Sequence, residues 1–304
     1  MNLYLPVAGL SVNILVIIGL GGIVGILSGM FGVGGGFLTT PLLIFYGIPP
    51  AVAVASSAPQ ITGASVSGVL AHRQRDGVDM QMGAVLVAGG ALGTILGGMI
   101  FRVLQANGQI DMVVALLYVF LLGGIGILMA REAVTSLVAL KGGGPPPSQA
   151  RRHNPLIAAL PLRWRFYRSG LYISPLAPLA LGFVTGIATA LMGIGGGFIL
   201  VPAMIYLLGM STRVVVGTSL FQILFVTVAA TMMHAVTTQS VDIVLASLLL
   251  IGSVSGAQIG ARLAQRVKPE YLRLILAFMV LTVAFRMALG LTWRPDEIYT
   301  VQSL

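Results

Sequence analysis

Two glycine-rich stretches contain the residues with the clearest chemical potential. The pattern Gly-(Val/Ile)-Gly-Gly-Gly-Phe-x-x-x-Pro occurs at residues 32–41 and again at residues 193–202. Four glycines in five residues disfavour a continuous helix, because each costs about 1 kcal/mol relative to alanine. A helix that restarts after such a break points unpaired N–H groups and the positive end of its dipole forward. Each stretch therefore predicts an anion-binding helix end.

Polar side chains that could complete such a site follow each break at matching distances. Ser57 and Gln60 lie three residues apart and share a helix face, and Ser219 and Gln222 repeat that spacing. Hydroxyl and amide groups donate hydrogen bonds without adding charge, which suits an anion that must also be released. Alternatively, the hydroxyls bond their own backbone or join neighbouring helices. The candidate substrate-binding residues are Gly34, Gly35, Gly36, Ser57, Gln60, Gly195, Gly196, Gly197, Thr218, Ser219 and Gln222.

The elements that must position these residues are membrane helices. The chain of 304 residues is 57% hydrophobic and 8% charged, with a mean hydropathy of +1.00, whereas soluble domains contain about 25% charged residues. Several apolar runs reach the roughly 20 residues that cross a bilayer. The apolar pieces after the breaks, residues 37–46 and 198–208, are shorter and predict half helices. We expect an all-α polytopic membrane protein.

The chain consists of two homologous halves. Gly32 aligns with Gly193 and Gln60 with Gln222, and polar residues between and beyond them recur in the same register. Each half is expected to hold about five helical segments, with V-shaped or re-entrant pairs at the breaks meeting near the midplane. We predict an N-terminal transmembrane repeat (residues 1–131), a basic Gly/Pro-rich cytoplasmic linker (132–172) and a C-terminal transmembrane repeat (173–304).

The distribution of basic residues predicts that the two repeats are inverted. The loop after His72 contains Arg73 and Arg75, whereas its counterpart after His234 has no Lys or Arg before Asp242. In the next pair of corresponding loops, the excess of basic residues is instead in the second half. Because cytoplasmic loops are enriched in Lys and Arg, corresponding loops should face opposite sides. We expect residues 73–82, 131–172 and 262–273 in the cytoplasm, and a net charge of +9 that reflects topology rather than nucleic-acid binding.

A repeated glycine triplet predicts close packing of helices. Glycines spaced four apart line one helix face, so that a neighbouring backbone can approach closely. The packing could lie within one protomer or between protomers, and a homodimer is therefore one possible assembly. The two triplets are Gly89, Gly93 and Gly97 in the first half and Gly252, Gly256 and Gly260 in the second.

Other chemistries find little support in the sequence. The chain has no cysteine and three histidines, and it lacks a nucleophile–base pair, a metal-ligand cluster and a phosphate-binding loop. We therefore expect no enzyme activity, no metal and no cofactor. No Asp or Glu falls inside a predicted span. His72 and His234 could anchor helix ends or move protons, and Arg213 and Arg286 could extend to the membrane surface or attract an anion.

The doubled glycine break, the Ser–Gln helix after it and the glycine triplets resemble the sulfite exporter TauE/SafE family, over about residues 10–291. The resemblance implies a permease for sulfite or organosulfonates in the bacterial inner membrane. We expect a secondary transporter of small anions, in which one repeat rocks against the other. The alternatives are an anion channel, a membrane assembly or metal-insertion partner, and, least supported, an intramembrane enzyme.

Overall fold

The computed structural model describes residues 2–31, 34–73, 77–141, 161–264 and 269–292. The first half contains β1 (Asn2–Leu5), β2 (Leu10–Asn13), α1 (Ile14–Phe31), α2 (Gly36–Phe45), α3 (Pro50–Arg73), α4 (Met80–Ala106) and α5 (Ile110–Lys141). The second half contains β3 (Trp164–Phe166), β4 (Leu171–Ile173), α7 (Leu176–Met192), α8 (Gly197–Tyr206), α9 (Thr212–Met233), its π-helical continuation η1 (His234–Thr238), α10 (Ile243–Ala264) and α11 (Pro269–Thr292).

Five of the described helical segments are long and apolar enough to cross a membrane. They are Met80–Ala106, Ile110–Glu132, Val214–Thr238, Ile243–Gly260 and Leu274–Thr292. The helices that flank the breaks, α1, α2, α7 and α8, are apolar but shorter. The chain is therefore an all-α membrane protein, and the helical segments expected in each half are present in the described residues.

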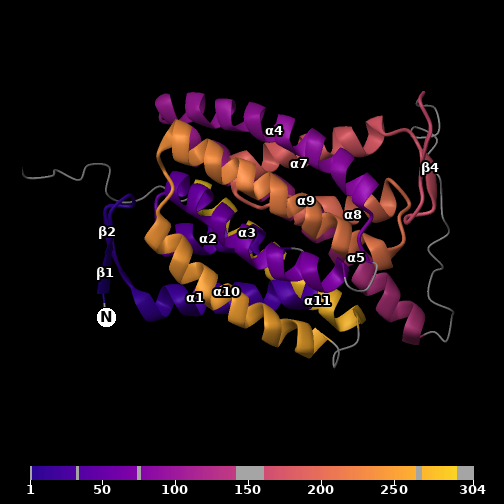
Figure 1. The fold of residues 1–304 in the computed structure, drawn as a ribbon. Coiled ribbons are helices and arrows are strands. Elements are labelled where there is room, and N and C mark those ends of the chain that lie inside the picture. Colours follow the sequence, from indigo (N-terminus) through magenta and orange to yellow (C-terminus); the bar gives the residue numbers. More distant parts are fainter. Residues whose placement is uncertain (1, 32–33, 74–76, 142–160, 265–268, 293–304) are drawn as a thin grey trace, which may run out of the picture.

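The closest helix pairs join the two halves of the chain. Helix α1 packs along α10, α4 along α7, α5 along α11 and α3 along α9. Figure 1 shows α4 and α7 side by side along one edge of the molecule and α1 and α10 along the opposite edge. The two β-hairpins lie at opposite ends (Figure 1). Each long edge is thus built from one helix of each half.

Glycine makes the contact between α1 and α10 a contact between backbones. A Cβ on Gly25 would lie 2.4 Å from the carbonyl oxygen of Ser253, and one on Gly256 would lie 2.2 Å from that of Gly22. Real Cβ atoms do not approach so closely, so even alanine would separate the two helices at these positions.

The same arrangement joins α4 and α7. A Cβ on Gly93 would lie 2.0 Å from the carbonyl oxygen of Phe183, and one on Gly186 would lie 2.1 Å from that of Gly90. Both glycine triplets therefore pack helices within one protomer, which resolves the alternative that the sequence left open. The homodimer stays a prediction.

The β1–β2 hairpin, which the sequence did not predict, is tied to the opposite half by a buried aspartate. Asp242 caps α10 by accepting hydrogen bonds from the N–H groups of Val244 and Leu245. Its second carboxylate oxygen accepts the N–H of Val7 in the hairpin turn, at 3.1 Å. Its own N–H donates to the Ser56 hydroxyl, at 2.9 Å.

The β3–β4 hairpin repeats this arrangement at the other end of the molecule. Asp79 caps α4 through the N–H of Met82 and also accepts hydrogen bonds from the N–H and hydroxyl groups of Ser169 in the hairpin turn. Its own N–H donates to the Thr218 hydroxyl. The segment expected as a linker thus includes the last turns of α5 and this hairpin, while residues 142–160 lie outside the described residues. The three-part division of the chain stays a prediction.

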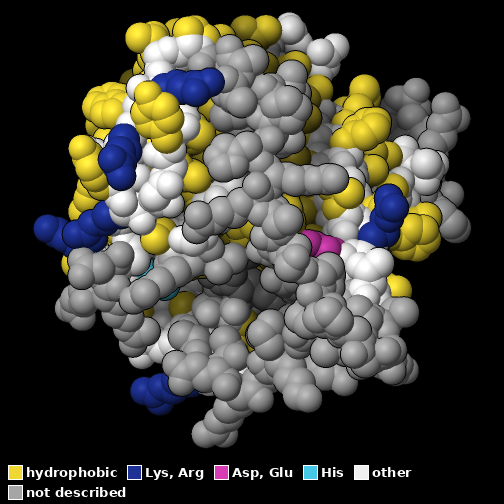
Figure 2. All heavy atoms as spheres, turned by 90° about the vertical axis from the view of Figure 1, so that its right-hand side faces the viewer, with side chains coloured by type: hydrophobic (Ala, Val, Ile, Leu, Met, Phe, Trp, Pro, Cys, Tyr) yellow, Lys and Arg dark blue, Asp and Glu magenta, His cyan; other side chains and the backbone are white. Residues whose placement is uncertain are grey.

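The end of the molecule that carries β3–β4 is rich in basic side chains. Figure 2 shows several Lys or Arg side chains around this end, between hydrophobic ones. The hairpin segment contains Arg165 and Arg168, and the Arg168 guanidinium donates to the carbonyl oxygen of Val78 at 3.3 Å. This contact places Val78, which precedes α4, at the same end as the hairpin.

Two glycines of α1 provide a matched test of the backbone contact. We expect Gly25→Ala to lower the unfolding temperature of the detergent-solubilised protein by roughly 3 °C or more, since overpacking costs about 1–3 kcal/mol. Gly19→Ala on the same helix should not lower it, because no atom outside the helix backbone lies within 4 Å of the added Cβ. Equal unfolding temperatures of the two variants would contradict the packing described above.

Candidate functional site

Both helix breaks form where the glycine pattern predicted them. Helix α1 ends at Phe31 and α2 begins at Gly36, while α7 ends at Met192 and α8 begins at Gly197. Left-handed φ values of 66° at Gly34, 72° at Gly195 and 76° at Gly196 explain the need for glycine there. The described residues of both breaks are buried. The glycines therefore allow sharp backbone turns inside the protein.

The two breaks touch each other at the centre of the molecule. A Cβ on Gly36 would lie 2.8 Å from the carbonyl oxygen of Gly193. The phenyl rings of Phe37 and Phe198, which begin α2 and α8, stack with their centroids 4.7 Å apart and an interplanar angle of 13°. The two half helices thus start from one common point.

Ser57 holds the second break from the side of α3. Its hydroxyl oxygen lies 3.2 Å from the carbonyl oxygen of Gly193, 2.9 Å from that of Val54 and 3.0 Å from the Thr40 hydroxyl. This predicted site residue is at the breaks, and its hydroxyl is engaged in hydrogen bonds within the protein.

The corresponding hydroxyls of α9 also have partners within the protein. The Thr218 hydroxyl accepts the N–H of Asp79, which joins α9 to the start of α4 near the β3–β4 hairpin. The Ser219 hydroxyl donates to the carbonyl oxygen of Val216 at 2.9 Å. Both side chains are buried. Thr218 therefore belongs to the hairpin end rather than to the point where the breaks meet.

The two glutamines are buried and incompletely hydrogen-bonded. Gln60 is 2% exposed and Gln222 is fully buried. Gln222 Nε2 donates a long bond of 3.4 Å to the Thr185 hydroxyl. Among the described side chains, the buried polar atoms without a partner are Gln60 Oε1, Ser65 Oγ and Gln222 Oε1. An unpaired buried acceptor costs about 1–3 kcal/mol, so these amides call for an explanation beyond stability.

Apolar side chains enclose the point where the breaks meet. Ile61 and Ile223 each follow a candidate glutamine in sequence and are almost fully buried. A Cβ on Gly195 would lie 3.0 Å from Ile61 Cγ2, and one on Gly34 would lie 3.4 Å from Ile223 Cδ1. The described glycines of both breaks are therefore shielded from solvent in this conformation.

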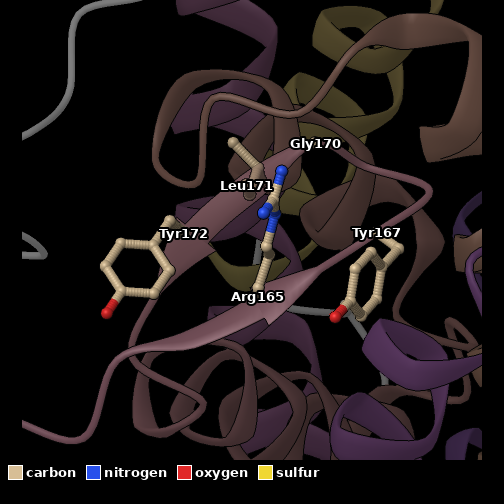
Figure 3. A pocket seen from close by; sticks show the side chains of 5 residues that line it. All are labelled: Arg165, Tyr167, Gly170, Leu171 and Tyr172. Atoms are coloured by element: carbon tan, nitrogen blue, oxygen red, sulfur yellow. The ribbon is translucent and has the colours of Figure 1, made fainter.

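A described pocket lies away from the breaks, on the β3–β4 hairpin. It has a volume of about 370 Å³ and is lined by Arg165, Tyr167, Gly170, Leu171 and Tyr172. Figure 3 shows the Arg165 side chain between the rings of Tyr167 and Tyr172. The pocket contains none of the residues predicted to bind substrate.

Several residues at the breaks were not predicted from the sequence. Thr185 and Thr189 lie on the face of α7 that meets Gly196, where an added Cβ would be 3.1 Å from Thr185 Cβ and 3.3 Å from the Thr189 hydroxyl. Tyr118 of α5 donates a 2.6 Å hydrogen bond to the carbonyl oxygen of Met192, at the end of α7. The spacing of four between the threonines, just before the break, was the available signal.

Two of the other polar candidates, His234 and Arg286, contact groups within the protein. His234 is buried, with Nε2 2.9 Å from the carbonyl oxygen of Ala190 and its ring edge-on to Phe101. The Arg286 guanidinium lies over the Phe45 ring, 5.3 Å from its centroid. The side chain of Arg213 lies outside the described part of the chain.

Comparison with known proteins identifies the family. The family model for the sulfite exporter TauE/SafE matches residues 17–287, which include both breaks. The chain belongs to the TauE/SafE family. Membership indicates a membrane transporter, in agreement with the long apolar helices.

Relatives of similar length occur in bacteria. The chain is 27% identical over 284 residues to a "Probable membrane transporter protein" of Xylella fastidiosa (strain 9a5c), covering 93% of this chain and 96% of the relative. It is 29% identical over 281 residues to the "Probable membrane transporter protein YjnA" of Bacillus subtilis (strain 168), covering 91% of this chain and 100% of the relative. No solved structure matches the chain.

The unpaired amides predict an unusual stability profile for this TauE/SafE protein. We expect Gln222→Met and Gln60→Met to unfold at the same or a higher temperature than the original protein, because each removes a buried oxygen that has no partner. Ser57→Ala should unfold at a lower temperature, since it removes the contact with Gly193. Differential scanning fluorimetry without added anion measures all three. Strong destabilisation by both glutamine substitutions would show that the amides serve packing alone.

Proposed function

We propose that this TauE/SafE protein is a secondary transporter for small anions, with sulfite, organosulfonates or related sulfur oxyanions as substrates. The observation that carries the proposal is the meeting of two helix N-termini inside the protein. The N–H groups of residues 195–198 have no acceptor among the described residues. Free N–H groups and the positive ends of helix dipoles favour an anion.

The charges around the breaks agree with an anionic substrate. The acidic side chains whose surroundings are described lie at helix ends or at the ends of spans, away from the breaks: Asp79, Asp111, Glu132 and Asp242. Asp79 and Asp242 are occupied as helix caps. Among the described side chains, no carboxylate therefore repels an anion at the point where α2 and α8 begin.

We propose a bacterial inner-membrane, multi-pass topology with two inverted repeats. Three observations support it. Equivalent hairpins lie at opposite ends of the molecule (Figure 1). The helix contacts are symmetric, since α1 packs on α10 as α7 packs on α4. The loop after α3 and the basic β3–β4 hairpin share one end, which the positive-inside rule assigns to the cytoplasm.

Alternating access then requires moving units that differ from the repeats. The backbone contacts between α1 and α10, and between α4 and α7, hold helices of different repeats together. Rocking one repeat against the other would break both contacts. We propose that these two pairs move as units relative to α3 and α9, whose Ile61 and Ile223 close the centre. Enclosure of the breaks favours this mechanism over an open anion channel.

Transport in proteoliposomes tests the proposal. We expect saturable uptake and counterflow of labelled sulfite or a labelled sulfonate, and loss of this flux in Gly196→Val and Gly35→Val. Gly196 has a left-handed φ of 76°, and a Cβ on Gly35 would meet Val24 at 2.6 Å. Gly124→Val is the matched control, because no atom outside its own helix backbone lies within 4 Å of a Cβ added at Gly124.

Three results would count against the proposal. Protein that moves none of these anions would contradict the substrate class. Normal flux in both break variants would remove the role of the breaks. Ohmic single-channel currents without counterflow would identify a channel instead.

A further inference from the structure

The two helix breaks differ in the hydrogen-bonding groups that they leave free. In the first break, the N–H of Gly35 donates to the Ser28 hydroxyl at 2.8 Å, and the N–H of Gly36 donates to the carbonyl oxygen of Gly34 at 2.6 Å. Two N–H groups at the start of α2 are therefore already occupied. The N–H groups of Gly34 and Phe37 have no acceptor among the described residues, so the first break offers a ligand fewer donors than four consecutive free N–H groups would.

In the second break, the backbone N–H groups remain available to a ligand. The N–H groups of Gly195, Gly196, Gly197 and Phe198 have no acceptor among the described residues. They precede or begin α8, a helix of ten residues whose dipole adds to their attraction for an anion. Two consecutive left-handed glycines, with φ of 72° and 76°, produce this arrangement, whereas the first break has one described glycine with positive φ.

The side chains that pack against the two breaks also differ. The neighbour of Gly196 on the preceding helix is Thr185, whereas the neighbour of Gly35 on α1 is Val24. Both neighbours are buried. The first half therefore has a valine where the second half has a threonine beside the break, while the next equivalent pair, Ser28 and Thr189, carries a hydroxyl in both halves.

Thr185 lies between the second break and Gln222, whose amide oxygen has no hydrogen-bond partner. Its hydroxyl donates to the carbonyl oxygen of Gly182 and accepts the Nε2 of Gln222. Thr185 therefore lies between Gly196 and the Gln222 amide, and it touches both. Gln222 is fully buried and its Oε1 has no partner. An amide oxygen accepts hydrogen bonds, so it is satisfied by a ligand that carries a donor.

We propose that the second break alone forms the oxyanion half-site, and that Gln222 selects oxyanions that also carry a hydrogen-bond donor, such as a hydroxyl or an ammonium group. The oxyanion oxygens accept from residues 195–198, and the donor reaches Gln222 Oε1. The first break, bounded by Val24, packs against the second. This inference rests on the proposed anion transport and names the half-site and the substrate class.

Substituting equivalent positions in the two halves tests the half-site. Isothermal titration of purified protein with 2-hydroxyethanesulfonate should show that Thr185→Val weakens binding by about tenfold or more, which corresponds to about 1.4 kcal/mol. Val24→Thr, the reciprocal change, should leave the affinity unchanged. Thr185→Ser keeps the hydroxyl and should retain most of the affinity. Thermal unfolding of each variant separates loss of binding from loss of fold.

A series of three sulfonates tests the selectivity. The original protein should bind 2-hydroxyethanesulfonate and 2-aminoethanesulfonate at least about tenfold more tightly than ethanesulfonate, because a site built around a substrate donor rejects the analogue that lacks it. Gln222→Met should bind all three with similar affinity. Since this variant is expected to be at least as stable as the original protein, misfolding would not explain the change.

The outcomes separate this inference from the proposed function. If none of the sulfonates nor sulfite binds the original protein, the proposed function fails and the inference fails with it. If the sulfonates bind but Val24→Thr and Thr185→Val have equal effects, the assignment to the second break is wrong. If ethanesulfonate binds as tightly as its hydroxyl and amino analogues, the role of Gln222 is wrong. In both of these cases anion transport stands.

Discussion

A helix that is interrupted inside a membrane has backbone groups that lipid cannot hydrogen-bond, so the protein must enclose them. Much of the fold serves this requirement. Ser57 and Tyr118 reach the end of α7 from two other helices, and Ser28 holds the N–H of Gly35. Ile61 and Ile223 pack beside Gly34 and Gly195. The N–H groups left unpaired at the breaks are therefore exceptions, and exceptions of this kind mark binding sites.

The two halves of the chain share their arrangement of elements but differ in the side chains at the breaks. The two hairpins, the two aspartate caps and the two glycine contacts repeat between the halves. At the breaks, however, the second half has Thr185 where the first has Val24, and among the described residues more N–H groups lack an acceptor at the second break than at the first. A scaffold with two equivalent positions allows one of them to differ in chemistry while the architecture is kept.

Much of the fold could be predicted, because membrane helices and glycine breaks leave strong sequence signals. The helices begin and end at the breaks as expected, and the helical segments of each half are present. The hairpins could not be predicted, since strands of three or four residues have no measurable periodicity. For the candidate site, glycine, serine and glutamine were found by their repetition. Thr185 was not found, because the equivalent residue of the first half is Val24 and a search for repeated residues passes over it.

The exchange of helices between the halves has a consequence for synthesis of the protein. The ribosome completes α1 and α4 before α7 and α10 exist, so the glycine faces of the early helices have no partner when they enter the membrane. The first half must wait in the bilayer with these faces against lipid or against assembly factors. Neither half can complete these contacts alone, so they form only after both halves have been synthesised.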